Sequence, residues 1–476
     1  MHILPAHGPT AAQTRRVQPL WVRTVLVVGA AAAVVTGVVS PAHPAVASPT
    51  ASPAVSRTAP VQAPPTPAQC RDRTGSTCYG PRQLLAAYGV TDLQAAGIDG
   101  RGRTICVLDS FGSPTVHQDL HEFSRAYGLP DARLTVVAPA GRVPAYDGSA
   151  ERAGWAGETS LDVQWAHAFA PRAAIRLIVT PTAETEGLAG FPEMATALAS
   201  EIGHDRCDVV SMSFGATEPT FDTPRQILQL RQRMFVPAAR RGVTLVAASG
   251  DAGATDFRKD GRLYRSRVDS WPSTDPLVTS VGGTRVQVDD AGRRTSPDVA
   301  WGGGSSAGGG GRSAVFPRPS WQDPVRSLVG TRRGTPDVAM LAAPETGVVV
   351  RETFDRQRTA ALGPWAVEGG TSAATPMFAG IVALADQRAG RRVGQLGPLL
   401  YGPLQRGPGG AAGNGIVDVR AGRTDVTDHA EPDGSLVSVR GHTARLGYDL
   451  ATGLGTVDAA TLVPALSAAA QAGMRR

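Results

Sequence analysis

The stretch GGTSAATPMFAG, residues 369–380, contains a serine in a setting that suits a nucleophile. Gly369 and Gly370 allow the backbone to approach a substrate closely. The apolar residues after Ser372 predict a helix that begins at this serine, and a helix N-terminus favours a developing negative charge. A serine that only caps a helix fits the same pattern, so the interpretation depends on finding a base.

A pair of carboxyl groups is the first candidate for that base. Glu158 and Asp162, in GETSLDVQWAHAFAP (residues 157–171), are four positions apart and share one face of a predicted helix. Two close carboxyls can share a proton, so that one stays ionised as a base while the other orients it. An exposed acidic pair with no such role is the alternative.

A third acidic residue ends a predicted strand in the segment VTLVAASGDAGATD. Asp251 can donate a hydrogen bond to an oxyanion only when it is protonated; an ordinary turn aspartate is the alternative. If Glu158 is an ionised base while Asp251 is protonated, either the working pH is acidic or burial raises the pKa of Asp251. The three motifs together therefore predict acid-active hydrolysis of acyl groups.

In combination these motifs resemble the sedolisins, the serine-carboxyl peptidases with a subtilisin-like fold. G-T-S-A-x-x-P around Ser372 is shared with subtilisins, whereas E-x-x-L-D-x-x-x-A-H-A-x-A-P and the S-G-D ending at Asp251 resemble sedolisins alone. The resemblance implies that Ser372 is the nucleophile, Glu158 the base, Asp162 its orienting partner and Asp251 an oxyanion ligand. It extends from about residue 78 to about residue 466.

The histidines do not fit the subtilisin alternative, which needs an HGTH-like motif. His117 and His121 lie in VHQDLHEF without neighbouring glycines, and we interpret them as surface or structural residues. His167 belongs to the sedolisin pattern but not to its catalytic set. Asp109, in VLDSFG, stands where subtilisins hold their catalytic aspartate, and we interpret it as structural or cleft-lining.

The C-terminal region resembles the sedolisin calcium loop at residues 417–419 and 444–455. The resemblance implies one structural Ca²⁺, an ion that prefers oxygen ligands. The implied ligands are the carboxylates of Asp418 and Asp449 and the carbonyls of Val419, Arg445 and Gly447. Arg445 stands where the family usually has glycine, and solvated loop aspartates are the alternative.

The N-terminus predicts export. Arginines precede the apolar run 25–39, and Ala45-Val46-Ala47 is a suitable cleavage site, so residues 1–47 are predicted to be a signal peptide; an uncleaved anchor is the alternative. Residues 48–77 are predicted to be a Pro/Ala-rich linker or a short pro-segment. They are too few for the large N-terminal prodomain that the resemblance implies.

The four cysteines suit an exported protein. Cys70 and Cys78 bracket a short polar loop and are predicted to pair. Cys106 and Cys207 each lie in an apolar run and either pair or remain buried thiols. No C-x-x-C occurs, which argues against a zinc site.

Charge gives little indication of partners. The net charge is +6, and Lys259 is the only lysine, but the arginines are scattered along the chain rather than clustered in runs. This pattern favours a solvated surface over binding to nucleic acid or a membrane.

The periodicity predicts an α/β fold in which a parallel sheet is flanked by helices on both faces. Buried strands are predicted at residues 103–109, 173–180, 207–214 and 242–249, with amphipathic helices at 189–203 and 223–241. The Gly/Ser-rich stretch 302–313 is predicted to be a long surface loop. Residues 78–476 would form one peptidase domain.

The leading hypothesis is a secreted, monomeric, acid-active serine-carboxyl endopeptidase that acts on proteins or peptides. A tripeptidyl exopeptidase with the same chemistry is one alternative. A non-catalytic secreted binding protein on a decayed peptidase fold is another; the missing prodomain supports it, and the four filled catalytic positions argue against it.

Overall fold

A computed structural model of the chain describes residues 62–405 and 414–472. The predicted signal peptide and residues 48–61 of the predicted linker lie outside these ranges. Within them, no helix is both long and apolar enough to cross a membrane.

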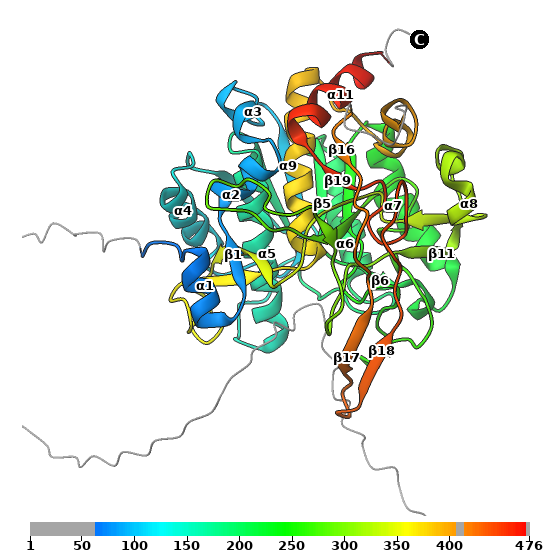
Figure 1. The fold of residues 1–476 in the computed structure, drawn as a ribbon, viewed down its shortest axis with the longest axis horizontal. Helices are drawn as coiled ribbons and strands as arrows, with labels where there is room; N and C mark the ends of the chain where they lie inside the picture. Colours follow the sequence, from blue (N-terminus) through cyan, green and yellow to red (C-terminus); the bar gives the residue numbers. More distant parts are fainter. Residues whose placement is uncertain (1–61, 406–413, 473–476) are drawn as a thin grey trace, which may run out of the picture.

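The centre of the molecule is a largely parallel sheet, as predicted (Figure 1). Neighbouring strands run parallel except at the edge, where β10 is antiparallel to β9. In spatial order the strands are β10 (Val299–Ala300), β9 (Thr279–Arg285), β7 (Thr244–Ala248), β5 (Val209–Met212), β2 (Thr104–Ser110), β4 (Ala174–Thr180) and β3 (Arg133–Val137), with β13 (Val338–Leu341) also pairing with β9.

Helices cover both faces of this sheet because the strands are apolar on both sides. Along β2, Ile105 and Val107 face one core, which contains α5 (Ala150–Phe169) and α9 (Thr371–Ala389). Cys106 and Leu108 face a second core, which contains α6 (Phe191–Gly203) and α7 (Pro224–Arg240). The alternation follows from the two-residue period of a strand, and the predicted α/β class is confirmed.

The other elements surround this frame. The remaining helices are α1 (Pro67–Thr74), α2 (Pro81–Ala87), α3 (Thr91–Ala95), α4 (Val116–Tyr127), α8 (Arg326–Val329), α10 (Gly397–Leu400) and α11 (Ala459–Ala472), with 3-10 turns at Glu218–Thr220, Ser320–Val325 and Pro403–Gln405. A small sheet joins β1 (Thr77–Tyr79), β14 (Thr346–Arg351) and β15 (Trp365–Glu368). Two-stranded pairs are β6 (Ala216–Thr217) with β8 (Ser270–Trp271), β11 (Gly311–Pro317) with β12 (Arg332–Thr335), β16 (Ile416–Val417) with β19 (Thr456–Val457), and β17 (Val426–Ala430) with β18 (Leu436–Val439), which extends as a ribbon from the body (Figure 1).

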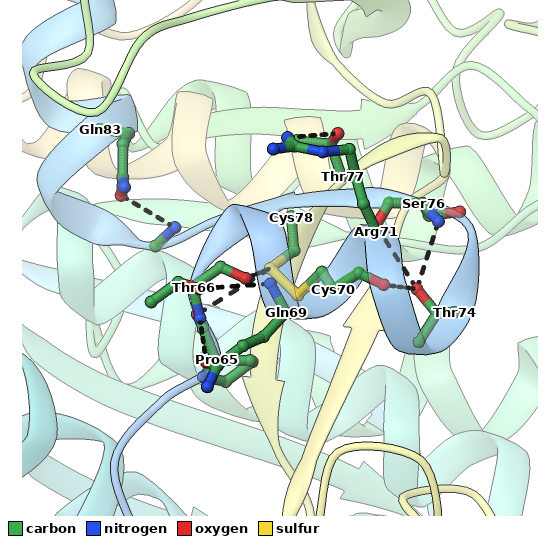
Figure 2. The surroundings of a disulfide bond; sticks show 11 residues. Pro65, Thr66, Gln69, Cys70, Arg71, Thr74, Ser76, Thr77, Cys78 and Gln83 are labelled. Atoms are coloured by element: carbon green, nitrogen blue, oxygen red, sulfur yellow. Dashed lines mark hydrogen bonds between the residues drawn. A yellow bond between two sulfur atoms is a disulfide. The ribbon is translucent and has the colours of Figure 1, made fainter.

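The folded part begins earlier than predicted, because residues 67–74 of the expected linker form α1. Thr66 caps this helix: its hydroxyl accepts from the Gln69 N–H at 3.2 Å, and its own N–H donates to the Gln69 side chain at 2.9 Å. Figure 2 shows how Cys70 on α1 is joined to Cys78 on β1, which confirms the predicted pair. The disulfide therefore ties the N-terminal segment to the β1–β14–β15 sheet.

The structure also decides between the two alternatives for the other cysteines. Cys106 lies on β2 and Cys207 lies just before β5, and these two strands are neighbours in the sheet. Their Cα atoms are 5.5 Å apart and the residues form a disulfide.

The Gly-rich stretch 302–313 is only partly the surface loop that was predicted. Ala307–Gly311 are buried. At Gly308 a Cβ would lie 3.2 Å from backbone atoms of Gly283, and at Gly309 it would collide with the Ser249 carbonyl. Glycine is needed here because two backbone segments pack against each other with no room for side chains.

The two disulfides close loops of very different length, so we expect them to contribute different amounts to the free energy of unfolding. Cys106 and Cys207 are 101 residues apart, whereas Cys70 and Cys78 are 8 apart. The chain-entropy model predicts that the double variant Cys106→Ala/Cys207→Ala loses about 4.7 kcal/mol of unfolding free energy and that Cys70→Ala/Cys78→Ala loses about 2.5 kcal/mol. Guanidinium unfolding curves measure both; equal losses, or a larger loss for the short loop, would contradict this account.

Candidate functional site

Ser372 lies at the start of α9, immediately after β15, and is 5% exposed. Gly370 precedes the helix with a φ of 82°, a conformation that a residue with a side chain rarely adopts. A Cβ at Gly370 would also collide with Oδ2 of Asp251. The glycine is therefore required both by the backbone turn into α9 and by the close approach of Asp251.

Glu158 and Asp162 lie on α5, which packs against α9, so the predicted pair meets the predicted serine. Asp162 is fully buried, and its Oδ1 accepts from the Ser213 hydroxyl at 2.9 Å. Ser213 follows β5 in the segment SMSFG and also donates to the Ser372 carbonyl at 3.4 Å. Ser213 thus links the end of the sheet to both helices.

The carboxyl group of Glu158 is the candidate general base for Ser372. Burial raises its pKa well above the usual value, and a hydrogen bond from the Ser372 hydroxyl opposes that rise. The charges of Asp109, Asp251 and Glu368 raise the pKa further. Since Oε1 of Glu158 is buried without a partner among the described residues, this carboxyl retains an acceptor for a proton.

Asp109 contributes a third carboxyl at the end of β2. Its Oδ2 accepts from the Thr159 hydroxyl at 3.0 Å, and its Oδ1 has no partner in the described structure. Burial raises its pKa to about 7, and its charge raises the pKa of both Glu158 and Asp162. Sequence reasoning placed Asp109 only as structural or cleft-lining; its position at the carboxyl end of a strand was the one available signal.

Asp251 follows β7 and lies against the start of α9. The backbone N–H and the hydroxyl of Thr371 both donate to its Oδ1 at 2.8 Å. Burial raises its pKa, although these two hydrogen bonds lower it. With Oδ1 occupied, Oδ2 is the atom left to carry a proton.

A buried ion-pair network that the sequence did not predict lies beside Glu158. Arg358, in the loop between β14 and β15, donates to Glu352 at 3.0 Å and to Glu368 at 2.8 Å. A Cβ at Gly157 would lie 2.5 Å from this guanidinium, so the glycine leaves room for the Arg358 side chain against α5. The network has no recognisable spacing, because its members belong to a loop whose path is set by tertiary contacts.

The histidines lie where the sequence placed them. His121 is exposed and pairs with Asp131 on the surface at 3.0 Å. His167 is buried and bonds to the Pro130 carbonyl at 2.9 Å, and burial lowers its pKa to about 4.

The proposed calcium ligands are adjacent in space. Oδ2 of Asp418 accepts from the Gly447 N–H at 3.1 Å, and Oδ2 of Asp449 accepts from the Arg445 N–H at 2.8 Å. Within the described residues, Asp418 Oδ1 is buried without a hydrogen-bonding partner, which leaves this oxygen available as a ligand. Arg420 donates to the other oxygen of Asp418 at 2.9 Å and would compete with an ion there.

A serine at a helix N-terminus, with a buried carboxyl beside its hydroxyl and a second acid beside the helix start, matches the arrangement that the resemblance to the sedolisins implies. The comparisons with known proteins agree. A sequence model of the subtilase family (Peptidase_S8) matches residues 100–394. Kumamolisin from Bacillus sp. (strain MN-32) is 34% identical over 398 residues, which cover 82% of this chain and 64% of that protein. Tripeptidyl-peptidase 1 from Homo sapiens is 31% identical over 366 residues, covering 73% of this chain and 57% of that protein.

A solved structure of Pseudomonas sedolisin, described as a serine-carboxyl proteinase complexed with two molecules of pseudo-iodotyrostatin, has the same fold. It aligns with a TM-score of 0.66 and 25% identity, covering 83% of this chain and 99% of that one. The chain belongs to the subtilase family and, within it, to the sedolisins. It spans less than two thirds of the length of the curated relatives given above.

The buried carboxyls predict an unusual dependence of stability on pH. Burial raises the pKa of Asp109, Asp256, Asp269 and Glu368 to about 7, whereas free carboxyls titrate near pH 4. Between these values the folded state binds more protons than the unfolded state, so stability falls as pH rises from about 4 to about 7. We expect the unfolding free energy to drop by on the order of several kcal/mol over this window.

Urea unfolding of the Ser372→Ala variant, chosen to prevent self-cleavage, measures this dependence. Adding Asp269→Asn should flatten the slope between pH 4 and 7, because that residue no longer titrates. Asp290→Asn, at an exposed position, is the matched control and should leave the slope unchanged. Stability that stays level or rises over this window would contradict the interpretation.

Proposed function

We propose that this chain is an acid-active serine-carboxyl endopeptidase that hydrolyses protein or peptide substrates after export. The observation that carries the proposal is the position of the buried Glu158 carboxyl beside the Ser372 hydroxyl, which lowers the pKa of that carboxyl, at the N-terminus of α9. A carboxyl, rather than an imidazole, is thus the base beside the nucleophile.

The first half of the reaction forms an acyl-enzyme. Ser372 Oγ attacks the scissile carbonyl carbon while its proton passes to the ionised Glu158, and the carbonyl π electrons move to the oxygen. The Ser372 N–H and a proton on Asp251 Oδ2 would then hold the oxyanion. Collapse of this intermediate breaks the C–N bond, and the leaving amine takes the proton from Glu158.

The second half repeats these steps with water. Water attacks the acyl carbon, Glu158 takes its proton, and the Ser372 oxygen leaves and recovers that proton. Asp162 accepts a hydrogen bond from the Ser213 hydroxyl, and this contact holds in place the face of α5 that carries Glu158. Asp109, Asp162 and Glu158 lie together and their negative charges repel one another, so the three carboxyls titrate as a coupled group. When one of the aspartates holds a proton, Glu158 is the carboxyl that ionises.

Exopeptidase activity is the second candidate, favoured by the similarity to tripeptidyl-peptidase 1. The two activities share all the chemistry above and differ in whether a free substrate N-terminus is needed. A substrate with an acetylated N-terminus separates them, since an endopeptidase cleaves it and a tripeptidyl exopeptidase does not.

Export is supported by chemistry of the described residues. The four cysteines of the chain form two disulfides, and such bonds persist in oxidising compartments. We propose an extracellular enzyme that acts as a monomer, with residues 1–47 as the signal peptide.

The rate should be highest below neutral pH and fall on both sides. The acidic limb reports protonation of the base, and the alkaline limb reports loss of the proton from Asp251. Burial raises the pKa of both groups, so both limbs lie above the values of free carboxyls. Measuring kcat/KM on an internally quenched, N-acetylated peptide from pH 3 to 8 gives the profile.

Two variants test the roles. Ser372→Ala should lose at least about 10⁴-fold in kcat, and Glu158→Gln should lose about 10²- to 10⁴-fold because general-base catalysis is removed. His121→Gln, at an exposed histidine, is the control and should keep full activity. An alkaline optimum that survives Glu158→Gln would overturn the proposal.

We also propose one structural Ca²⁺ in the C-terminal region. Asp418 and Asp449 would supply carboxylates, and Val419, Arg445 and Gly447 would supply carbonyls. The support is the unpartnered, buried Oδ1 of Asp418 and the contacts that bring residues 445–449 onto this aspartate. The ion would replace Arg420 as the partner of Asp418 and hold the C-terminal loops together.

Removal of calcium should therefore lower stability rather than alter the chemistry directly. With Ca²⁺ at about 100 times its Kd, chelation should remove about 2.7 kcal/mol of unfolding free energy. Asp418→Asn should abolish the difference between calcium and chelator, whereas the exposed neighbour Asp428→Asn should preserve it. Identical melting temperatures with calcium and with chelator, together with no calcium bound in equilibrium dialysis, would exclude the site.

A further inference from the structure

Arginines that are far apart in the sequence gather on one surface around His442. Arg267 donates to the Gly441 carbonyl at 3.2 Å, and Arg423 donates to the Thr443 hydroxyl. Burial, together with the charges of nearby arginines, lowers the pKa of His442 to about 4. We define the arginine patch as Arg267, Arg312, Arg423, Arg440 and Arg445.

Most of this charge is uncompensated. Arg423 pairs with Asp425 at 2.7 Å. Arg267 and Arg312 donate only to carbonyl groups, and the side chains of Arg440 and Arg445 have no hydrogen-bonding partner in the part of the chain that the structure describes. These four arginines are exposed. An exposed cluster of one sign is unusual, because it repels itself and is normally interspersed with acids.

The patch borders the segment that carries Asp251. Gly253, two residues after Asp251, packs so closely on the Thr424 carbonyl that a Cβ would collide with it, and a Cβ at Gly441 would collide with the same carbonyl. The loop containing Arg267 is joined to the same segment by the Val268 N–H, which donates to the Ala254 carbonyl at 3.1 Å. The backbone segment that carries Asp251 is therefore in direct contact with the segments that carry Arg267, Arg423 and Arg440.

We propose that the arginine patch is an exosite for an acidic segment of the protein substrate, a run of Asp or Glu flanking the bond that is cleaved. This inference rests on the proposed peptidase function. Continuity with the Asp251 segment favours the substrate itself over an unrelated polyanion. Guanidinium groups form charge-assisted hydrogen bonds with carboxylates in a fixed fork geometry.

The proposal predicts a pH signature. Guanidinium groups stay charged at every relevant pH, whereas substrate carboxyls lose their charge below about pH 4. The titratable groups facing the patch are His442, Asp425, and the pair Asp418 and Asp449 near Arg445, with Arg420 beside Asp418. Because His442 gains charge in acid, the patch itself does not weaken there, and loss of binding must come from the substrate.

The test compares two quenched peptides with one cleavage sequence, flanked either by four glutamates or by four glutamines. At pH 5 and low salt we expect the glutamate peptide to have about three- to tenfold higher kcat/KM, through KM. The advantage should vanish at pH 3 and in 0.5 M NaCl. Arg312→Gln/Arg440→Gln should remove most of it without changing kcat/KM for the glutamine peptide.

Arg101→Gln is the matched control, since this exposed arginine precedes β2 at the opposite end of the strand from Asp109. Equal kcat/KM for the two peptides, or an advantage that survives the double variant, would overturn the exosite. Fluorescence anisotropy of both peptides on Ser372→Ala tests binding without turnover, so a failure of the peptidase proposal is seen separately. A single-stranded oligonucleotide of equal charge that binds more tightly than the glutamate peptide would also overturn it and indicate a general polyanion site.

Discussion

Three carboxyl groups, those of Asp109, Glu158 and Asp162, meet where β2 ends between the sheet and α5. Bringing negative charges together away from water is unfavourable, so such a cluster persists only by holding protons or by pairing with cations. No arginine bonds to these three groups in the described residues. Ionising all three groups together is therefore unfavourable, and the pKa of each is raised.

Close backbone packing holds the cluster in place. Gly157 lets the β14–β15 loop rest on α5, and Gly370 lets Asp251 reach the start of α9. Each glycine is next to a residue of the site, so the helices and loops that carry the acids approach more closely than side chains would permit. Close packing over a glycine also places Thr424 against Gly253 and thereby joins the C-terminal region to the segment that contains Asp251.

Charge is thus distributed in two opposite ways across the molecule. Among the described residues, acids without a bonded cation are buried around Ser372, whereas four arginines without a paired acid are exposed beside His442. Near Glu158, Arg358 links Glu352 and Glu368 and keeps these two further buried carboxyls from being unpaired.

The resemblance to the sedolisins predicted that Ser372, Glu158, Asp162 and Asp251 belong to one site. The sequence by itself determined the fold class, the four principal strands and the helices α5 and α9. These follow from local patterns, because strand and helix periodicity, a four-residue spacing and a glycine before a helix are visible over a few residues. The tertiary structure decided what depends on contacts between distant segments: the pairing of Cys106 with Cys207, the burial of Ala307–Gly311, the Arg358 network and the gathering of scattered arginines. The sequence alone does not specify the distance between residues a hundred positions apart, because only the packing of the sheet and its loops sets those distances.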